Sequence, residues 1–402
     1  MIIAYVSRTN LSVVLAIPSF IKSFNLSDTD RGMLNSAFFW AYATLQIPAG
    51  WVVDRYGVKY PYALGFVFWC FASAALGFAQ TVMQLVTLRV LLGVAESVVA
   101  PASLRWIRCH FQEVQRGLAV GLYMTGSKIG PAIAVPLAAW ATVLYGWRAM
   151  FLLLGLGGAF WLIPWLILVR NDAPQITGPA KQAAGKAPVT FGRVIVSPVT
   201  WGTVVATFCY MYFVYFCMTW IPAYFVEQRH LSLSRMGFYT FFSFGGMALM
   251  AALAGWVADV MIARGGNAVA VRKWFTLAGF AIACTELIGA QSSSVTTALV
   301  FAVISLSGLG LATANYWALT QTLMPASAIG RISGVQNCAA SLAGIVAPIV
   351  TGWLKQQTGN YGAPMRAIWM VLALGAVSYL VLVREKYAPR AKMSGSGSPG
   401  LC

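Results

Sequence analysis

Charged side chains inside long apolar runs are the first candidates for chemistry in this sequence. Glu96 lies in the apolar run 84–106, Arg89 precedes it on the same run, and Arg8 lies in the first apolar run. Ionisable groups in apolar surroundings are costly and are therefore functional candidates. Burial disfavours the charged form of a carboxyl group, whereas a nearby arginine favours it. Glu96 is therefore a candidate proton carrier, and the alternative is a structural ion pair with Arg8.

Three cations in these runs, Arg8, Arg89 and Lys128, favour a negatively charged ligand. The guanidinium of Arg8 is a planar fork that fits a carboxylate, and Tyr5 shares its helix face. Arg89 and Glu96 share one face of a helix about 10 Å apart along its axis, so Arg89 is free to meet another group. The alternative for Arg89 and Lys128 is that each extends its charge to water.

The composition indicates what must position these side chains. Charged residues make up 9% of the 402 residues and hydrophobic residues 59%, with a mean hydropathy of +0.74. An average soluble domain is about 25% charged, so a soluble enzyme, a disordered chain and a nucleic-acid-binding domain are excluded. The net charge of +17 is scattered between apolar runs, as in membrane proteins. The seven cysteines and two histidines have no metal-ligand spacing, so we expect no metal and no cofactor.

Apolar runs of about 20 residues can cross a bilayer as helices. The sequence predicts an all-α polytopic membrane protein with 12 transmembrane helices, at 1–24, 33–54, 60–81, 84–106, 116–143, 147–170, 196–226, 235–261, 272–291, 295–324, 330–354 and 364–384.

The longest polar stretch divides these helices into two halves. We expect an N-terminal six-helix bundle at 1–170, a cytoplasmic linker at 171–195, a C-terminal six-helix bundle at 196–386 and a tail at 387–402. The Ser-Gly repeat of that tail resembles an expression scar. With both termini in the cytoplasm, most Lys and Arg residues face inward, as the positive-inside rule requires. We therefore expect a multi-pass protein of the cell (inner) membrane.

One loop pattern occurs once in each half. Gly50-Trp51-Val52-Val53-Asp54-Arg55-Tyr56-Gly57 follows the second run, and Gly255-Trp256-Val257-Ala258-Asp259, with Arg264, follows the eighth. This pattern resembles the signature loop of the major facilitator superfamily, a class of transporters built from two repeats of six helices. The resemblance implies a conformational latch formed by Gly50, Asp54, Arg55, Gly57, Asp259 and Arg264. The alternative is a simple turn with charged anchors.

Further stretches resemble the anion:cation symporters of that superfamily, which transport D-galactonate, glucarate and hexuronate. The matching stretches are Tyr5–Ser12, Gln46–Trp51, Leu88-Arg89 with Glu96, Thr219–Pro222 and Ser333–Asn337. Two positions depart from the galactonate type. Ser7 stands where those members commonly carry Asp, and Lys128 follows Ser127 where they have a Gln nearby.

This resemblance adds residues to the candidate site. Tyr42, Tyr316, Trp317 and Asn337 match positions that contact substrate in galactonate-type members, and Asn315 is an adjacent polar group. The aromatic residues among them could equally serve helix packing. An amide in the middle of an apolar run, such as that of Asn337, needs a hydrogen-bond partner.

The residues and the resemblance together predict a secondary active transporter and no enzyme. We expect proton-coupled symport of a small organic anion, a sugar acid or other carboxylate, by alternating access. Ser7 keeps an organic anion exchanger or facilitator without obligatory protons open. A drug/proton antiporter is less favoured because acids would be expected in place of Arg8 and Arg89, and a membrane sensor is also less favoured. The expected partners are the anion, protons and the lipid bilayer, with no nucleic acid, and we expect a monomer.

Overall fold

The computed structural model describes residues 1–169, 191–325 and 328–389 of the chain. These residues form helices and no strands. The first half, residues 1–169, contains α1 (Ile2–Val14), α2 (Pro18–Ser23), α3 (Asp28–Tyr56), α4 (Lys59–Ala75), η1 (Leu76–Phe78), α5 (Val82–Glu96), α6 (Val99–His110), α7 (Glu113–Gly157), η2 (Gly158–Trp161) and α8 (Leu162–Leu168).

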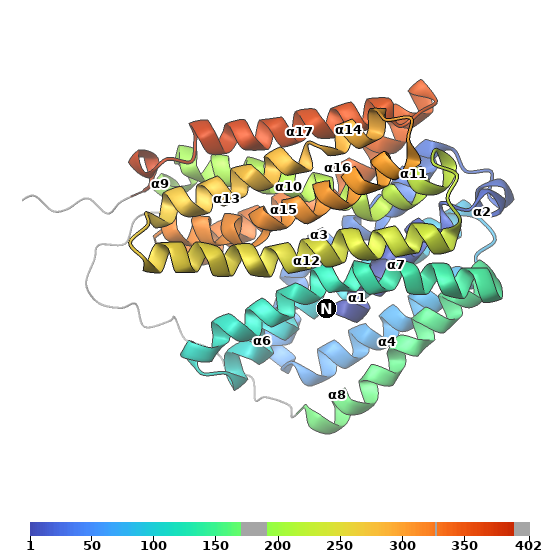
Figure 1. Ribbon diagram of the computed structural model, residues 1–402. Helices are drawn as coiled ribbons and strands as arrows, with labels where there is room; N and C mark the ends of the chain where they lie inside the picture. The colour runs from blue at the N-terminus through green and yellow to red at the C-terminus, as the bar shows by residue number, and fades with distance from the viewer. Residues whose placement is uncertain (170–190, 326–327, 390–402) are drawn as a thin grey trace, which may run out of the picture.

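The second half, residues 191–389, repeats the pattern of long, nearly parallel helices (Figure 1). It contains α9 (Phe191–Val196), α10 (Pro198–Thr219), α11 (Ile221–Glu227), α12 (Leu233–Ala263), α13 (Ala268–Ala283), α14 (Glu286–Gln291), α15 (Val295–Leu323), α16 (Ile329–Thr358), α17 (Gly362–Val381) and η3 (Glu385–Tyr387). Most of the predicted linker, up to residue 190, and the tail from residue 390 lie outside the described residues.

Local sequence explains where several helices begin and end. Ser27 and Asp30 form a capping box that starts α3 a turn before its apolar run. Thr81 and Gln84 do the same for α5. Gly57, with φ of 83°, ends α3 in a conformation that glycine adopts without steric cost. Gly146, with φ of 81°, divides the continuous helical stretch α7 into two segments.

The described part of each predicted span overlaps one to three of these helices, and the all-α prediction is confirmed. Nine helical stretches of the described residues are long and apolar enough to cross a membrane. One of them, Ala119–Leu168, contains two predicted spans joined at Gly146. The first span is represented by the shorter apolar helix Ile2–Val14. The count of 12 spans therefore stays a prediction.

The two halves meet along two helix pairs, α3 with α16 and α7 with α12. In Figure 1, α12 and α7 run side by side across the molecule. We call the end that carries α2 and α11 the α2 end, and the opposite end the α9 end. Small residues allow close approach near the α2 end, because a Cβ on Gly32 would overlap the carbonyl of Pro348 and one on Gly237 would lie 2.9 Å from Cα of Pro136.

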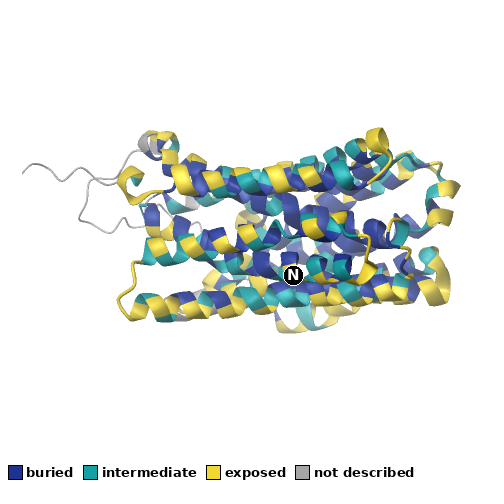
Figure 2. Ribbon diagram, turned by 45° about the horizontal axis from the view of Figure 1, so that its top comes forward, coloured by how far each residue is buried: buried dark blue, intermediate teal, exposed yellow. Residues whose placement is uncertain are grey.

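Figure 2 shows buried residues toward the interior of the helix bundle and exposed residues mostly on its outer surfaces. The helix α10 is the clearest case, since 17 of its 22 residues are buried. Large apolar side chains remain exposed on the outward faces of other helices, among them Ile47, Phe68, Phe160 and Trp256. Exposed apolar area of this extent suits contact with lipid.

Candidate functional site

The predicted pairing of Arg8 with Glu96 is present and fully enclosed. Nε and Nη2 of Arg8, on α1, lie 2.6 Å and 2.5 Å from Oε1 of Glu96, at the end of α5. The side chains are 5% and 0% exposed. The second carboxylate oxygen of Glu96, Oε2, is buried and has no hydrogen-bond partner. One oxygen of this carboxyl group therefore holds the arginine, and the other is available to a proton.

Aromatic rings enclose the guanidinium of Arg8. Its Cζ lies 4.8 Å from the ring centre of Tyr5, 4.9 Å from that of Phe38 and 4.5 Å from that of Tyr42. Phe38 and Tyr42 stack on each other from α3. Ring faces attract a guanidinium and keep it desolvated. The structure thus brings the predicted residues Tyr5, Arg8, Tyr42 and Glu96 together.

Arg89 lies beside this cluster and points at the backbone of α1. It is 2% exposed, its Nη1 donates to the carbonyl oxygen of Ser7 at 3.3 Å, and its Nε has no partner. Its Cζ lies 5.5 Å from the ring centre of Phe38. Arg89 is therefore a buried cation that contacts the backbone of α1 at Ser7, and no described carboxylate forms an ion pair with it.

Lys128 lies on α7 and faces the second half. It is 8% exposed, and its Nζ lies 5.5 Å from the ring centre of Tyr210 on α10. The described residues give its ammonium no hydrogen bond and no ion pair. Tyr210 bonds to Thr313 through its hydroxyl at 2.7 Å and packs on Tyr316 with ring centres 4.7 Å apart. Lys128 thus lies at the boundary between the halves, close to the aromatic side chain of Tyr210, which packs on Tyr316.

The remaining predicted residues of the second half have different surroundings. Tyr316 is 2% exposed and lies against both Tyr210 and the partly buried Trp317. The buried Asn315 donates to the carbonyl of Leu311 on its own helix, and its Oδ1 has no partner. Asn337 is exposed on α16 and donates to Oε1 of Gln46 on α3 at 2.7 Å. Its amide therefore has the partner that the sequence demanded, in the other half of the chain.

The sequence did not predict two aromatic residues at the boundary between the halves, Tyr210 and Tyr215 on α10. Tyr215 packs edge-on against Phe39 of α3 with ring centres 4.6 Å apart. The run 196–226 is apolar on all sides, so no periodicity indicated which of its many aromatic residues face the first half.

Both repeated loops hold their aspartates in ion pairs within one half. Asp54 accepts from Arg105 of α6 at 2.7 Å, and Asp259 accepts from Arg272 of α13 at 2.9 Å. Arg55 of the first loop lies over the rings of Trp51 and Tyr56 instead. The other predicted latch residues have backbone or packing positions: a Cβ on Gly50 would lie 3.9 Å from Cβ of Pro101, Gly57 ends α3 with positive φ, and Arg264 is the C-cap of α12.

An ion cluster that the sequence did not predict joins the two halves at the α2 end. Arg31 of α3 contacts Asp28 at 2.7 Å and Glu227 of α11 at 2.6 Å. Lys355 of α16 lies 2.7 Å from the same two carboxylates. Tyr361 donates to Glu227 at 3.0 Å, and burial and this carboxylate raise the pKa of its phenol well above its ordinary value. We call these five residues the outer cluster.

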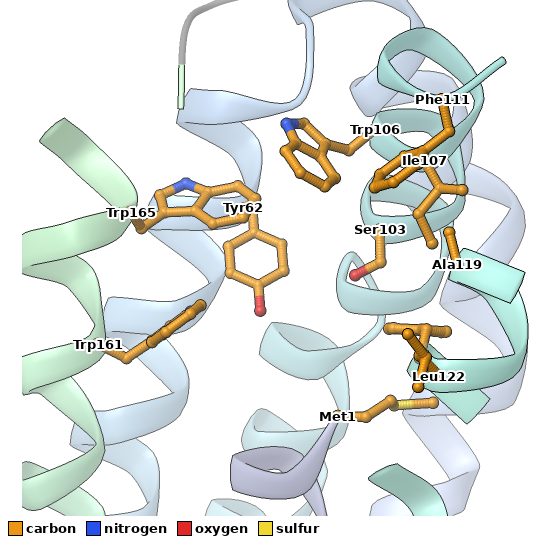
Figure 3. A pocket seen from close by; sticks show the side chains of 11 residues that line it. Met1, Tyr62, Ser103, Trp106, Ile107, Phe111, Ala119, Leu122, Trp161 and Trp165 are labelled. Atoms are coloured by element: carbon orange, nitrogen blue, oxygen red, sulfur yellow. The ribbon is translucent and has the colours of Figure 1, made fainter. Parts of the chain in front are cut away.

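The described part of the chain also contains a cavity of about 560 Å³ within the first half (Figure 3). Met1, at the start of α1, contributes to its wall, and the rings of Tyr62, Trp106, Trp161 and Trp165 surround it. No charged side chain lines it, and neither Arg8 nor Glu96 is part of its wall. Among the described residues, no three His, Cys, Asp or Glu side chains gather as a metal site would require.

Comparisons with known proteins match this architecture over nearly the whole chain. The sequence profile of the Major Facilitator Superfamily matches residues 1–348. The D-galactonate transporter of Escherichia coli O6:H1 is 30% identical over 411 residues, which cover 96% of this chain and 93% of the relative. The hexuronate transporter of Bacillus subtilis is 28% identical, with 95% and 91% covered.

A solved structure of a bacterial homologue of the human lysosomal transporter Spinster, in an inward-facing and occupied conformation, has a TM-score of 0.79 and 17% identity. The alignment covers 99% of this chain and 96% of that chain. Proteins of the Major Facilitator Superfamily carry solutes across membranes and are not enzymes. The long apolar helices described above agree with this role. The chain is a multi-pass membrane protein that belongs to the major facilitator superfamily.

Proposed function

We propose that this transporter imports a small organic anion together with protons by alternating access. The observation that carries the proposal is the buried contact between Arg8 and Glu96, in which one carboxylate oxygen is bound and the other is unpartnered. If Arg8 exchanges the carboxylate of Glu96 for that of the substrate, substrate binding is linked to protonation of Glu96. The names of the relatives, D-galactonate and hexuronate transporters, support a sugar acid as the anion.

The coupling follows from competition for one guanidinium. In the empty transporter, the carboxylate of Glu96 neutralises Arg8. A proton on Glu96 weakens this pair and leaves the guanidinium as a charged donor, held in place by the rings of Tyr5, Phe38 and Tyr42. The substrate carboxylate then binds the freed fork through charge-assisted hydrogen bonds. Loss of the substrate inside the cell returns Arg8 to Glu96 and releases the proton.

The other predicted residues would hold the rest of the anion. Lys128 and the hydroxyls of Tyr5 and Tyr42 offer hydrogen bonds from the first half, and Tyr316 and Trp317 offer aromatic surface from the second. Asn337 would donate to the substrate only after its bond to Gln46 breaks. Arg89 would act through the backbone of α1 at Ser7 and would not touch the substrate. Asn315, which bonds within its own helix, would have a supporting place.

Alternating access is supported by the difference between the two ends of the molecule. In the predicted topology the α2 end faces outside, and there the outer cluster and the glycine contacts hold the two halves together. In the described part of the chain, the ion pairs of the latch aspartates near the α9 end lie within one half, Asp54 with Arg105 and Asp259 with Arg272. We therefore interpret the structure as an inward-facing conformation, with the α9 end on the cytoplasmic side of the inner membrane.

Uptake into proteoliposomes tests the proposal. A panel of labelled acids, D-galactonate first, is offered with and without an inward proton gradient. Uptake should rise with the gradient in the wild type, and the gradient should have no effect in Glu96→Gln. Glu286→Gln is the matched control, because Glu286 is a buried carboxyl bonded to Ser305 and distant from the Arg8 site. Uptake that ignores the gradient but is stimulated by internal anion would establish exchange instead, the alternative that Ser7 motivates.

A further inference from the structure

Carboxyl groups inside the described helices are scarce. Only Glu96 and Glu286, at 0% and 4% exposure, are buried among the described acids. Oε2 of Glu286 accepts from Ser305 between α14 and α15, within the second half. The nearby Arg229 is directed to the hydroxyl of Tyr224 and to backbone carbonyls around residue 290. Glu286 therefore belongs to a separate polar contact, and Glu96 is the one described carboxyl at the Arg8 site.

Among the described residues, no second acid interacts electrostatically with Glu96, so none is placed to carry a further proton there. The charged or titratable groups close enough to interact electrostatically with it are the Met1 amine, Tyr5 and Arg8 of α1, Tyr62 of α4, Arg89 of α5 and Tyr215 of α10. Tyr42 of α3 lies over the guanidinium of Arg8. Arg89, the second cation, meets the backbone carbonyl of Ser7.

The burial of the pair restricts which states can move across the membrane. With Glu96 ionised and no substrate, Arg8 is neutralised. With Glu96 protonated and a substrate carboxylate bound, Arg8 is neutralised again. A protonated Glu96 without substrate leaves Arg8 without a carboxylate, and an ionised Glu96 with substrate places two carboxylates on one guanidinium. Each of these two states buries one more uncompensated charge than the two neutral states, which is unfavourable. Protons and substrate molecules therefore cross in equal numbers. Arg89 and Lys128 carry their charges in both directions of the cycle and leave this count unchanged.

We infer that each transport cycle moves one proton with one substrate, so that the transporter concentrates monoanions in an electrically neutral step. This inference rests on the proposed function and adds its stoichiometry and the charge of its substrate. A dianion moved with one proton would carry negative charge inward. An inside-negative potential of 100 mV opposes that movement by about 2.3 kcal/mol, or about 50-fold in accumulation. A single proton cannot offset this under a gradient of about one pH unit, which supplies about tenfold.

The test uses wild-type protein in proteoliposomes under a gradient of about one pH unit, with the membrane potential set by potassium and valinomycin. A monocarboxylate from the panel should accumulate about tenfold at zero potential, and an inside-negative potential of 100 mV should leave that value unchanged. D-glucarate, a dicarboxylate, should stay below its external concentration at that potential. A rise of the monocarboxylate with the potential, or accumulation of the dicarboxylate, would overturn the inference.

The same experiment separates failure of the inference from failure of the proposed function. If the pH gradient drives nothing, proton coupling itself is wrong. If the gradient drives uptake and the potential adds to it, only the single-proton stoichiometry is wrong.

A gain-of-function variant gives an independent readout. Ser7→Asp places a carboxylate on the residue whose backbone Arg89 contacts. We expect the variant to couple a second proton and to make monocarboxylate accumulation rise with an inside-negative potential. Glu286→Gln should remain electrically neutral like the wild type. Potential-dependent accumulation in Glu286→Gln that differs from the wild type would assign a proton to the second half and contradict the inference.

Discussion

At the level of single residues, the proposed transport mechanism depends on Arg8, which binds either the carboxyl group of Glu96 or a carboxylate of the substrate. The sequence indicated Arg8 and Glu96 because charges in apolar runs are rare. It could not indicate Tyr210 or the direction of Asn315, because residue type and helical spacing do not reveal which neighbour a side chain meets. Asn315 bonds within its own helix, whereas Lys128 reaches a ring of the other half.

Replacement of Arg8 by lysine tests whether the fork geometry matters. Lysine keeps the charge but loses the bidentate contact and part of the attraction to the three rings. We expect a loss of about 1.5 to 3 kcal/mol of substrate binding, which is about tenfold to a hundredfold in KM. The measurement is concentration-dependent uptake, normalised to protein in the membrane.

Arg148→Lys is the matched control, because Arg148 is exposed and lies over Trp147 at the α2 end. An unchanged KM in Arg8→Lys, with the control also unchanged, would show that the guanidinium does not hold the substrate.

At the scale of helices, the apolar runs predicted where each element lies but not how the elements meet. The run at 33–54 predicted a helix, and the capping box at Ser27 starts α3 earlier, at Asp28. The glycines that let α3 and α16 touch are ordinary helix residues in the sequence, since their role depends on a partner more than 300 positions away. The repeated loops were visible as motifs, whereas the pairing of Asp259 with Arg272 required the fold.

A larger side chain at Gly32 tests the closed contact between α3 and α16. A Cβ there would overlap the carbonyl of Pro348, so Gly32→Leu should hold the α2 ends apart. We expect this variant to bind substrate from outside but to transport at less than about a tenth of the wild-type rate, a loss of at least about 1.4 kcal/mol. Gly334→Leu is the control, because no atom lies near a Cβ at that position. Equal transport by both variants would show that this contact does not need to close.

At the scale of the whole molecule, the outer cluster is a network of ion pairs that joins the two halves at the α2 end. It uses Asp28 and Arg31 from the first half against Glu227, Lys355 and Tyr361 from the second. The sequence placed these residues at helix ends, but long-range pairing cannot be obtained from local patterns. An outward-facing state must break these contacts, so their strength biases the equilibrium between the two states.

Lys355→Ala removes two of these contacts and leaves Asp28 and Glu227 less neutralised. We expect a shift of about 1 to 3 kcal/mol toward the outward-facing state, because charge-assisted contacts of partly buried groups have this range. Spin labels at Lys22→Cys and Asn360→Cys, with the exposed Cys109 and Cys338 replaced, report the separation of the α2 ends. The population of long distances should rise in Lys355→Ala. The same distance distribution as in the parent protein would mean that the cluster does not control closure.

In the proposed mechanism, substrate enters with a proton carried by Glu96. The movement of protons during uptake is therefore the quantity to measure. Labelled D-galactonate, or another monocarboxylate that the transporter accepts, is added outside weakly buffered proteoliposomes while external pH is recorded. We predict alkalinisation of the medium in proportion to uptake by the wild type and by Glu286→Gln, and none during any uptake that Glu96→Gln retains. Uptake by the wild type without a change in pH, or the same alkalinisation in Glu96→Gln, would contradict the account.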